Sequence, residues 1–187
     1  MQKLLLIMGD IAAGKTTFSR ILSERYHVAV FQKDTVKEIL GDHIGFHNRE
    51  ENKKLSDATI AIMCHTFSQI AKTGNSVILE ANFHEVEQQK LHEIARENQY
   101  EVLTLVLRGD EEVLYQRYLH RMNEEQRHPV HLSTTLHIRE DFLRIARYIR
   151  NEVVIGKVIV IEATDFGYQR DEELLKKIDA FMDFSCL

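Results

Sequence analysis

A glycine-rich loop directly after the first apolar run limits the folds open to this chain more than any other stretch. Residues 3–8 are largely apolar, and residues 9–17 then read Gly-Asp-Ile-Ala-Ala-Gly-Lys-Thr-Thr. The spacing Gly-x4-Gly-Lys-Thr, placed between a buried strand and the start of a helix, is the phosphate-binding loop called the P-loop. A chance match in a glycine turn would lack these flanking patterns, and here both are present. The sequence therefore predicts a nucleoside triphosphate site.

Each residue type in this loop has a physical role in holding a triphosphate. Glycine permits backbone angles that turn amide groups inward around phosphate oxygens. Lys15 can place its charge against the β- and γ-phosphates, and the Thr16 hydroxyl can ligate Mg²⁺. The helix that follows points the positive end of its dipole at the same anion. We therefore predict that the nucleotide contacts Gly9, Asp10, Ile11, Ala12, Ala13, Gly14, Lys15, Thr16 and Thr17.

Apolar runs and helical patterns alternate along the rest of the chain. Strands are expected at residues 3–8, 28–31, 76–80, 101–107 and 158–161. Helices are expected at residues 14–25, 34–40, 60–73, 86–97, 110–123, around 142–149, and 174–181, with a loop or short helical excursion at 41–52. Apolar strands without strict alternation are typical of a parallel sheet that helices cover on both faces. We predict an α/β fold, a P-loop NTPase three-layer sandwich with a five-stranded parallel sheet and a small helical lid.

Length and composition narrow the class of protein. The 187 residues are 44% hydrophobic and 28% charged, which suits one domain over residues 1–187 with a lid segment at about 111–135. The net charge of −5 argues against nonspecific coating of nucleic acid, although an oligonucleotide end stays open as a substrate. The apolar start is too short for a signal peptide or a membrane span. Cys64 and Cys186 suggest no disulfide framework, so we expect a cytoplasmic protein without a membrane partner; its oligomeric state is open.

Two carboxylates follow predicted strands at the edge where the P-loop lies. The carboxyl ends of parallel strands meet at one edge, so Asp34 and Glu80 are expected near the triphosphate. Asp34 is predicted as the general base that accepts the proton of an acceptor hydroxyl, and it can also cap the next helix. Glu80 is predicted to hold Mg²⁺ together with Thr16, a buried structural carboxylate being the alternative. Asn82 can bind the acceptor or shape the turn.

A basic segment in the second half of the chain predicts a lid. Arg117 and Arg121 share a helix face, and Arg127 begins the run Arg-His-Pro-Val-His. Arginines that close over a triphosphate neutralise charge in the transition state. Arg121 and Arg127 are therefore predicted to be catalytic and Arg117 to contact the nucleotide, a solvated arginine face being the alternative. Thr164, after the last strand, is predicted to border the adenine, although a loop before a helix explains it equally well.

With these residues in place, the chain resembles the small P-loop kinases of the chloramphenicol phosphotransferase, zeta-toxin and polynucleotide 5′-kinase type. The resemblance covers most of the chain and rests on residues 9–17, on Asp34, on the run Val-Ile-Leu-Glu-Ala-Asn at 77–82, and on the arginine-bearing lid. It implies that Asp34 activates the acceptor and that lid arginines contact ATP phosphates. The run at 127–131 is similar to a segment of predicted AAA-type kinases in this group, where glycine often replaces Val130.

Three functions are compatible with these features. The leading hypothesis is an ATP- and Mg²⁺-dependent phosphotransferase that moves the γ-phosphoryl group to a hydroxyl of a small molecule. A nucleotide-dependent switch or ATPase without an acceptor is the second, although the sequence has no guanine-selecting Asn-Lys-x-Asp run. An oligonucleotide 5′-end kinase is the third, and the acidic balance makes nucleic acid an unlikely partner.

Overall fold

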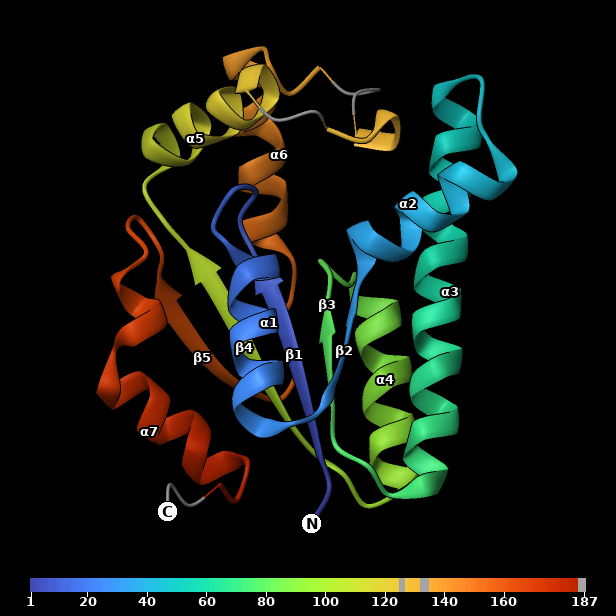
Figure 1. Cartoon of the computed structure of the whole chain (residues 1–187), viewed down its shortest axis with the longest axis vertical. Helices are drawn as coiled ribbons and strands as arrows, with labels where there is room; N and C mark the ends of the chain where they lie inside the picture. Colours follow the sequence, from blue (N-terminus) through green and yellow to red (C-terminus); the bar gives the residue numbers. More distant parts are fainter. Residues whose placement is uncertain (125–126, 132–134, 185–187) are drawn as a thin grey trace.

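A computed structural model describes residues 1–124, 127–131 and 135–184 of the chain (Figure 1). Residues 125, 126 and 132–134 of the predicted lid, and Cys186, lie outside the described residues. The strands are β1 (Lys3–Gly9), β2 (Ala29–Gln32), β3 (Val77–Glu80), β4 (Glu101–Arg108) and β5 (Lys157–Glu162). The helices are α1 (Lys15–Tyr26), α2 (Lys33–Ile44), α3 (Arg49–Thr73), α4 (Glu85–Glu97), α5 (Glu111–Glu124), α6 (Arg139–Asn151) and α7 (Glu172–Phe181), with 3₁₀ turns η1 (Pro129–His131) and η2 (Gly167–Arg170).

The five strands form a parallel sheet in the order β2-β3-β1-β4-β5. Strand β1 lies in the middle, and Ile7 faces Glu80 of β3 on one side and Leu105 of β4 on the other. Because all strands run the same way, their carboxyl ends lie at one edge, which is the upper edge in Figure 1. The predicted parallel α/β fold is therefore confirmed, and the register places the end of β3 beside the loop that leaves β1.

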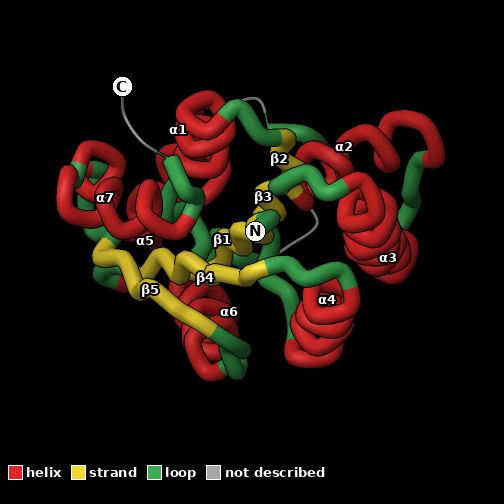
Figure 2. Tube along the Cα trace, turned by 90° about the horizontal axis from the view of Figure 1, so that it is seen from below, coloured by secondary structure: helices red, strands yellow, loops and turns green. Residues whose placement is uncertain are grey.

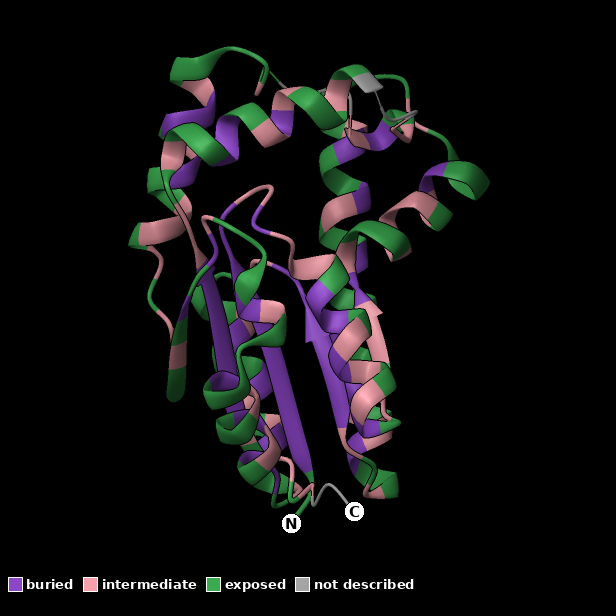
Figure 3. Ribbon diagram, turned by 60° about the vertical axis from the view of Figure 1, so that its left-hand side comes forward, coloured by how far each residue is buried: buried purple, intermediate pink, exposed green. Residues whose placement is uncertain are grey.

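Helices cover both faces of the sheet (Figure 2), the central strands between them are buried (Figure 3), and the buried side chains form two apolar cores, one on each face. Leu5 and Ile7 of β1 belong to a core that helices α1 and α7 share, whereas Leu4 and Leu6 belong to a core with α3 and α4. All seven residues of β1 are buried. Each fully buried leucine contributes roughly 1.5–3 kcal/mol, so β1 is firmly fixed and the P-loop starts from a rigid position.

Helices α2 and α3 cover more of the chain than the sequence patterns predicted. The expected break at residues 41–52 contains only a short loop, because α2 continues to Ile44 and α3 begins at Arg49. The Asn48 side chain accepts the Glu51 N–H (2.9 Å), and the Glu51 carboxylate accepts the His47 N–H, so this polar run starts a helix. Capping chemistry therefore replaces the predicted loop and gives α3 twenty-five residues.

Helices α5 and α6 lie above the upper edge of the sheet, on the side of the P-loop away from α2 and α3 (Figure 1). The first turn of α5 is capped by Asp110, whose carboxylate accepts the N–H groups of Glu112 and Val113 at 3.0 Å. Helix α5 belongs to the segment predicted as a lid, about residues 111–135, and α6 follows that segment. Within the part of the chain that the structure describes, no helix is long and apolar enough to cross a membrane.

Gly9 supplies the first stability prediction, because it packs against the backbone of β4. Its φ is +126°, and a Cβ atom there would lie 2.1 Å from the Leu107 carbonyl oxygen. Gly74 has a φ of +71° but leaves ordinary contact distances for a Cβ atom. We expect Gly9→Ala to lower the free energy of unfolding by more than about 3 kcal/mol, and Gly74→Ala by only about 1 kcal/mol. Urea denaturation measures both, and equal losses would contradict the steric account.

Candidate active site

A cleft of about 850 Å³ lies at the carboxyl edge of the sheet, between the P-loop, α2 and α5. The P-loop contributes Ile11, Ala12, Gly14, Lys15, Thr16 and Thr17 to its lining. Other predicted site residues in the lining are Asp34, Glu80, Arg117, Arg121 and Arg127. Among the predicted site residues, all of them described by the structure, Gly9, Asp10, Ala13 and Thr164 do not line it. The structure thus brings most of the predicted site together in one place.

Lys15 lies at the base of the cleft, where backbone carbonyls hold its ammonium group. Its Nζ donates to the carbonyl oxygens of Gly9 (3.0 Å) and Asp10 (2.7 Å). Loss of solvent lowers the pKa of Lys15, while the negative charges of Glu80 and Asp34 oppose that shift. The positive charge of Arg121 lowers the same pKa further. Three carboxylates, those of Glu80, Asp34 and Asp10, and a second cation are therefore close enough to Lys15 to influence its pKa.

Thr16 and Glu80 meet directly beside Lys15. The Thr16 hydroxyl donates to the Glu80 carboxylate across 3.0 Å, because the end of β3 lies next to the start of α1. Glu80 is only 5% exposed, and burial raises its pKa whereas the charge of Lys15 lowers it. A hydroxyl and a carboxylate are hard oxygen donors of the kind that Mg²⁺ prefers. The donor set therefore suits the predicted metal.

Asp34 projects from the first turn of α2 into the same cleft. The prediction that Asp34 caps this helix is wrong, since the N-cap residue is Gln32 and α2 begins at Lys33. The Gln32 side chain instead reaches α1, donating to the Thr16 carbonyl (2.8 Å) and the Ser19 hydroxyl (2.7 Å). This leaves the Asp34 carboxylate directed at the ligand edge, where its charge raises the pKa of Glu80 and opposes the lowering at Lys15.

Three contacts fix the P-loop. The Gly9 N–H donates to the side-chain oxygen of Asn82, a residue that also lines the cleft (2.8 Å), so this contact shapes the loop. The Tyr168 hydroxyl donates to the Ala13 carbonyl (2.9 Å). The Asp10 side chain is 1% exposed and pairs with Arg150 at 2.6 Å, on the far side of the loop from the cleft. The predicted contact of the nucleotide with residue 10 therefore concerns its backbone and stays a prediction.

The predicted lid arginines take different positions. Arg117 donates to the carbonyls of Ala163 (3.0 Å) and Thr164, and its guanidinium lies 4.2 Å from the centre of the Phe166 ring. Arg117 therefore shapes the loop after β5 as well as lining the cleft. The Thr164 hydroxyl accepts the Asp110 N–H (2.7 Å) and also contacts Glu162, outside the cleft lining. The position of Thr164 beside adenine stays a prediction.

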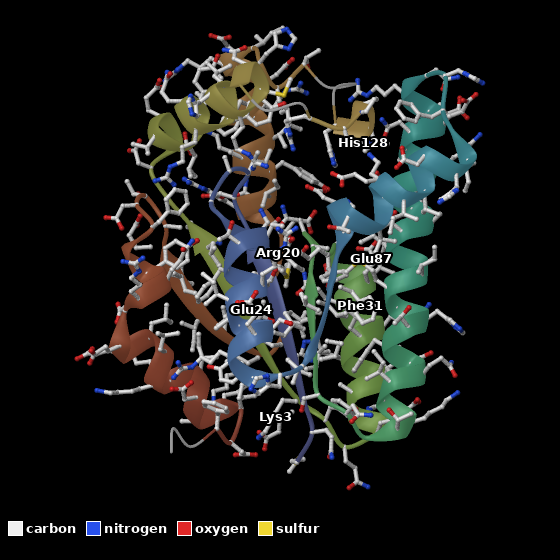
Figure 4. The ribbon with its side chains drawn as sticks, viewed as in Figure 1. Lys3, Arg20, Glu24, Phe31, Glu87 and His128 are labelled. Carbon is white, nitrogen blue, oxygen red and sulfur yellow. The ribbon has the colours of Figure 1, made fainter. Side chains whose placement is uncertain are left out.

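Residues 127–131, which we call the bridge, connect the lid side of the cleft with α2 and α3. Arg127 faces α5, where its guanidinium lies 5.9 Å from the Tyr118 ring centre. His128, labelled in Figure 4, pairs with Asp42 of α2 at 2.9 Å, and His131 pairs with Glu38 at 2.8 Å. The bridge therefore forms a wall of the cleft opposite the P-loop.

Val130 anchors the centre of the bridge. Its side chain is buried against Gly41, and its carbonyl accepts the Asn52 amide (2.9 Å) and the Lys37 ammonium (3.4 Å). Asn52 is only 3% exposed, so its amide is committed to this contact rather than to solvent. The buried Val130 side chain and the two hydrogen bonds to its carbonyl thus hold the bridge on α2 and α3.

Several residues of the site were absent from the sequence prediction. Glu38 follows Asp34 by four residues and therefore shares its helix face, a spacing that could have identified it. Asn52 and Arg150 had no comparable signal, because their partners are 78 and 140 residues away in the chain. Other lining residues not predicted as site residues include Arg20, Lys33, His120 and Phe166.

Comparison with known families supports the P-loop assignment. Residues 5–141 match a family model described as an AAA domain, which is well over half of the chain. None of the curated proteins matches the sequence.

Solved structures share the whole architecture at low sequence identity. A kinase candidate from Chloroflexus aurantiacus J-10-fl superposes with a TM-score of 0.80 at 22% identity, over 97% of this chain and 96% of the other. A sugar kinase from Janibacter sp. HTCC2649 gives 0.64 at 16% identity, over 99% and 96%. Shikimate kinase from Bacteroides thetaiotaomicron gives 0.58 at 15% identity, over 97% and 99%. At these identities the likeness establishes the fold.

The contact between Gly41 and Val130 provides a test of the bridge. A Cβ atom at Gly41 would lie 2.4 Å from a Val130 methyl carbon, so Gly41→Ala should displace the bridge. Replacing a glycine by alanine inside helix α2 stabilises the helix itself by roughly 1 kcal/mol. A displaced bridge in Gly41→Ala would therefore not be explained by unfolding of α2. We expect trypsin to cleave after Arg127 about tenfold faster in Gly41→Ala. Val130→Ala removes the clashing methyl carbon but also loosens the bridge, because that methyl carbon is part of its apolar anchor. Adding Gly41→Ala to Val130→Ala should therefore change the cleavage rate little, and a further increase as large as that of the single Gly41→Ala change would contradict the steric account.

Proposed function

The chain belongs to the AAA domain family and has the fold of P-loop kinases, and from this premise we propose that it is an ATP-dependent phosphotransferase acting on a hydroxyl of a small molecule. The observation that carries the proposal is the convergence of Lys15, Thr16, Glu80 and Asp34 on one cleft. A nucleotide-binding module alone has no need of a second carboxylate on the acceptor side. A kinase requires one, because the acceptor proton must leave as the new bond forms.

The loop side of the cleft is suited to a nucleoside triphosphate. Lys15 would exchange its carbonyl partners for the β- and γ-phosphates, and the amides at the start of α1 would face the same oxygens. Arg121 and Arg127 line the opposite wall from α5 and the bridge. They would neutralise the charge that develops on the transferred group and help to exclude water.

Thr16 and Glu80 are the residues that would hold Mg²⁺. The bound ion would screen the phosphate charges and orient the leaving group. Their mutual hydrogen bond shows that both side chains already reach one point of the cleft.

Asp34 is the residue assigned to activate the acceptor. Its carboxylate would accept the hydroxyl proton while the acceptor oxygen bonds to the γ-phosphorus and the bond to the β-phosphate oxygen breaks, so that ADP leaves. The lowered pKa of Lys15 and the raised pKa of Glu80 reflect an enclosed site, in which such charge interactions are stronger than in water.

The acceptor compartment lies between α2 and the bridge. Glu38 is held by His131 at 2.8 Å and lies one helical turn from Asp34, so polar groups surround the position where a hydroxyl would bind. The names of two structural neighbours, a sugar kinase and a shikimate kinase, are consistent with a small polar acceptor.

Replacing Asp34 tests the base. Asp34→Asn keeps the shape of the side chain but cannot take a proton, so we expect phosphoryl transfer to fall by roughly 10²–10⁴-fold. MgADP affinity should stay within about twofold. A metabolite library screened for ATP-dependent gain of one phosphoryl group identifies the acceptor, and transfer is then timed with it. Unchanged transfer would exclude Asp34, and labelling of an RNA or DNA 5′ end, or ATP hydrolysis with no acceptor product, would contradict the small-molecule assignment.

Replacing Thr16 tests the metal site. Thr16→Val removes the hydroxyl and leaves Glu80 without the 3.0 Å contact, whereas Thr16→Ser retains the hydroxyl. We expect Mg²⁺ to strengthen ATP binding in the wild type and in Thr16→Ser, and the gain to shrink by about tenfold or more in Thr16→Val. Calorimetry with and without Mg²⁺ measures this, and an equal response in both variants would remove Thr16 from the site.

A further inference from the structure

Arg150, at the end of α6, forms ion pairs with Asp10 of the P-loop and with Glu111 of α5. Its Nε lies 3.1 Å from both carboxylate oxygens of Asp10, and one terminal nitrogen lies 2.6 Å from Asp10 Oδ2. The same guanidinium donates to the Gly109 carbonyl and to the Glu111 carboxylate (3.0 Å). One side chain therefore joins the P-loop, the turn after β4 and the first turn of α5.

The carboxylate, the N–H and the carbonyl oxygen of Asp10 all make further hydrogen bonds. Its carboxylate also accepts the Gly109 N–H (3.1 Å), and its own N–H donates to the Leu107 carbonyl (2.8 Å). Its carbonyl oxygen accepts the Lys15 ammonium at 2.7 Å. The side chain held by Arg150 and the carbonyl that holds Lys15 thus belong to the same residue, on opposite faces of the loop.

The Arg150 end belongs to the lid. Helix α5, in the lid segment, precedes the bridge in the chain and α6 follows it, so Glu111 and Arg150 lie at the ends of the two helices on either side of the bridge. Arg108 supports this position by donating to the Arg150 carbonyl (3.2 Å). A movement of α6 therefore changes a direct contact with the P-loop, and a movement of α5 changes the contact that Glu111 makes with the same guanidinium.

We propose that Arg150 is a positioning residue that couples the lid helices α5 and α6 to the P-loop through Asp10. The inference rests on the proposed function, because it concerns how the loop presents Lys15 to a nucleotide. A bidentate arginine holds the carboxylate in one orientation, which a point charge cannot do. Nucleotide binding draws the Lys15 ammonium from the Asp10 carbonyl toward phosphate, and so changes the position of the Asp10 peptide. The Arg150 guanidinium, which binds the Asp10 carboxylate and Glu111, transmits this displacement to α6 and α5. Arg150 itself has no contact with the nucleotide in this scheme.

The test uses the full chain with MgADP as the probe, in Arg150→Gln, Asp10→Asn, the double variant and Arg147→Gln. Arg147 is the matched control, since it contacts Glu111 at 3.6 Å with a side chain 66% exposed and does not reach Asp10. We expect MgADP affinity to fall about tenfold in each of the first two, within the range usual for coupled sites. If the residues act as one unit, the double variant will be about as weak as one single variant, not a hundredfold weaker.

Hydrogen exchange separates positioning from simple stability. In the wild type and in Arg147→Gln, MgADP should slow exchange in residues 9–17 and also in α5 and α6. In Arg150→Gln the slowing should be confined to residues 9–17. A merely structural role would lower the melting temperature but leave the affinity of the folded protein and its exchange pattern intact, and that result would overturn the inference.

The remaining outcomes also decide the question. Arg150→Gln leaves the buried Asp10 carboxylate without its cation and can fail to fold for that reason. In that case the double variant replaces it, since Asp10→Asn removes the unpaired negative charge. Wild-type affinity and exchange in the double variant would overturn the coupling. Failure of wild-type protein to bind MgADP would instead defeat the proposed nucleotide site, and equal losses in Arg147→Gln would show a general charge effect and reject the specific role of Arg150.

Discussion

The burial of β1 between β3 and β4 is the constraint from which the site follows. All seven residues of this strand are buried, so the position at which the chain leaves the sheet cannot drift. Gly9 then turns against the Leu107 carbonyl, an approach that only a residue without a Cβ atom permits. The P-loop therefore begins at a fixed position along the sheet edge, and the register of β1 with β3 puts Glu80 beside the start of the loop.

Charge organises the cleft that the sheet edge creates. Lys15 is desolvated and held by two carbonyls, while Glu80 and Asp34 partly offset the cost of its charge. Arg121 and Arg127 add positive charge from the opposite wall. This grouping of cations in one cleft has a charge complementary to that of a polyanion.

Two groups of contacts hold the helices around the cleft. Val130 and its two hydrogen-bond donors hold the bridge on α2 and α3. Arg150 joins α6 and α5 to Asp10 of the P-loop. The two groups differ in kind, since one is a buried apolar contact with a shared carbonyl and the other is an ion pair between a buried carboxylate and a partly exposed arginine.

The sequence alone determined the parallel α/β fold and the P-loop, because local spacing and strand–helix alternation specify both, and it selected Asp34 and Glu80 because strand ends share one edge. It expected a loop or short helical excursion at residues 41–52, most of which lie in α2 and α3, and it placed a helix cap at Asp34, whereas the N-cap position is Gln32. Only the tertiary structure decided that Asp10 faces Arg150 and that Val130 docks beside Asn52. Those contacts join residues 78 and 140 positions apart, and no local pattern encodes which distant side chains the packing of helices will bring together.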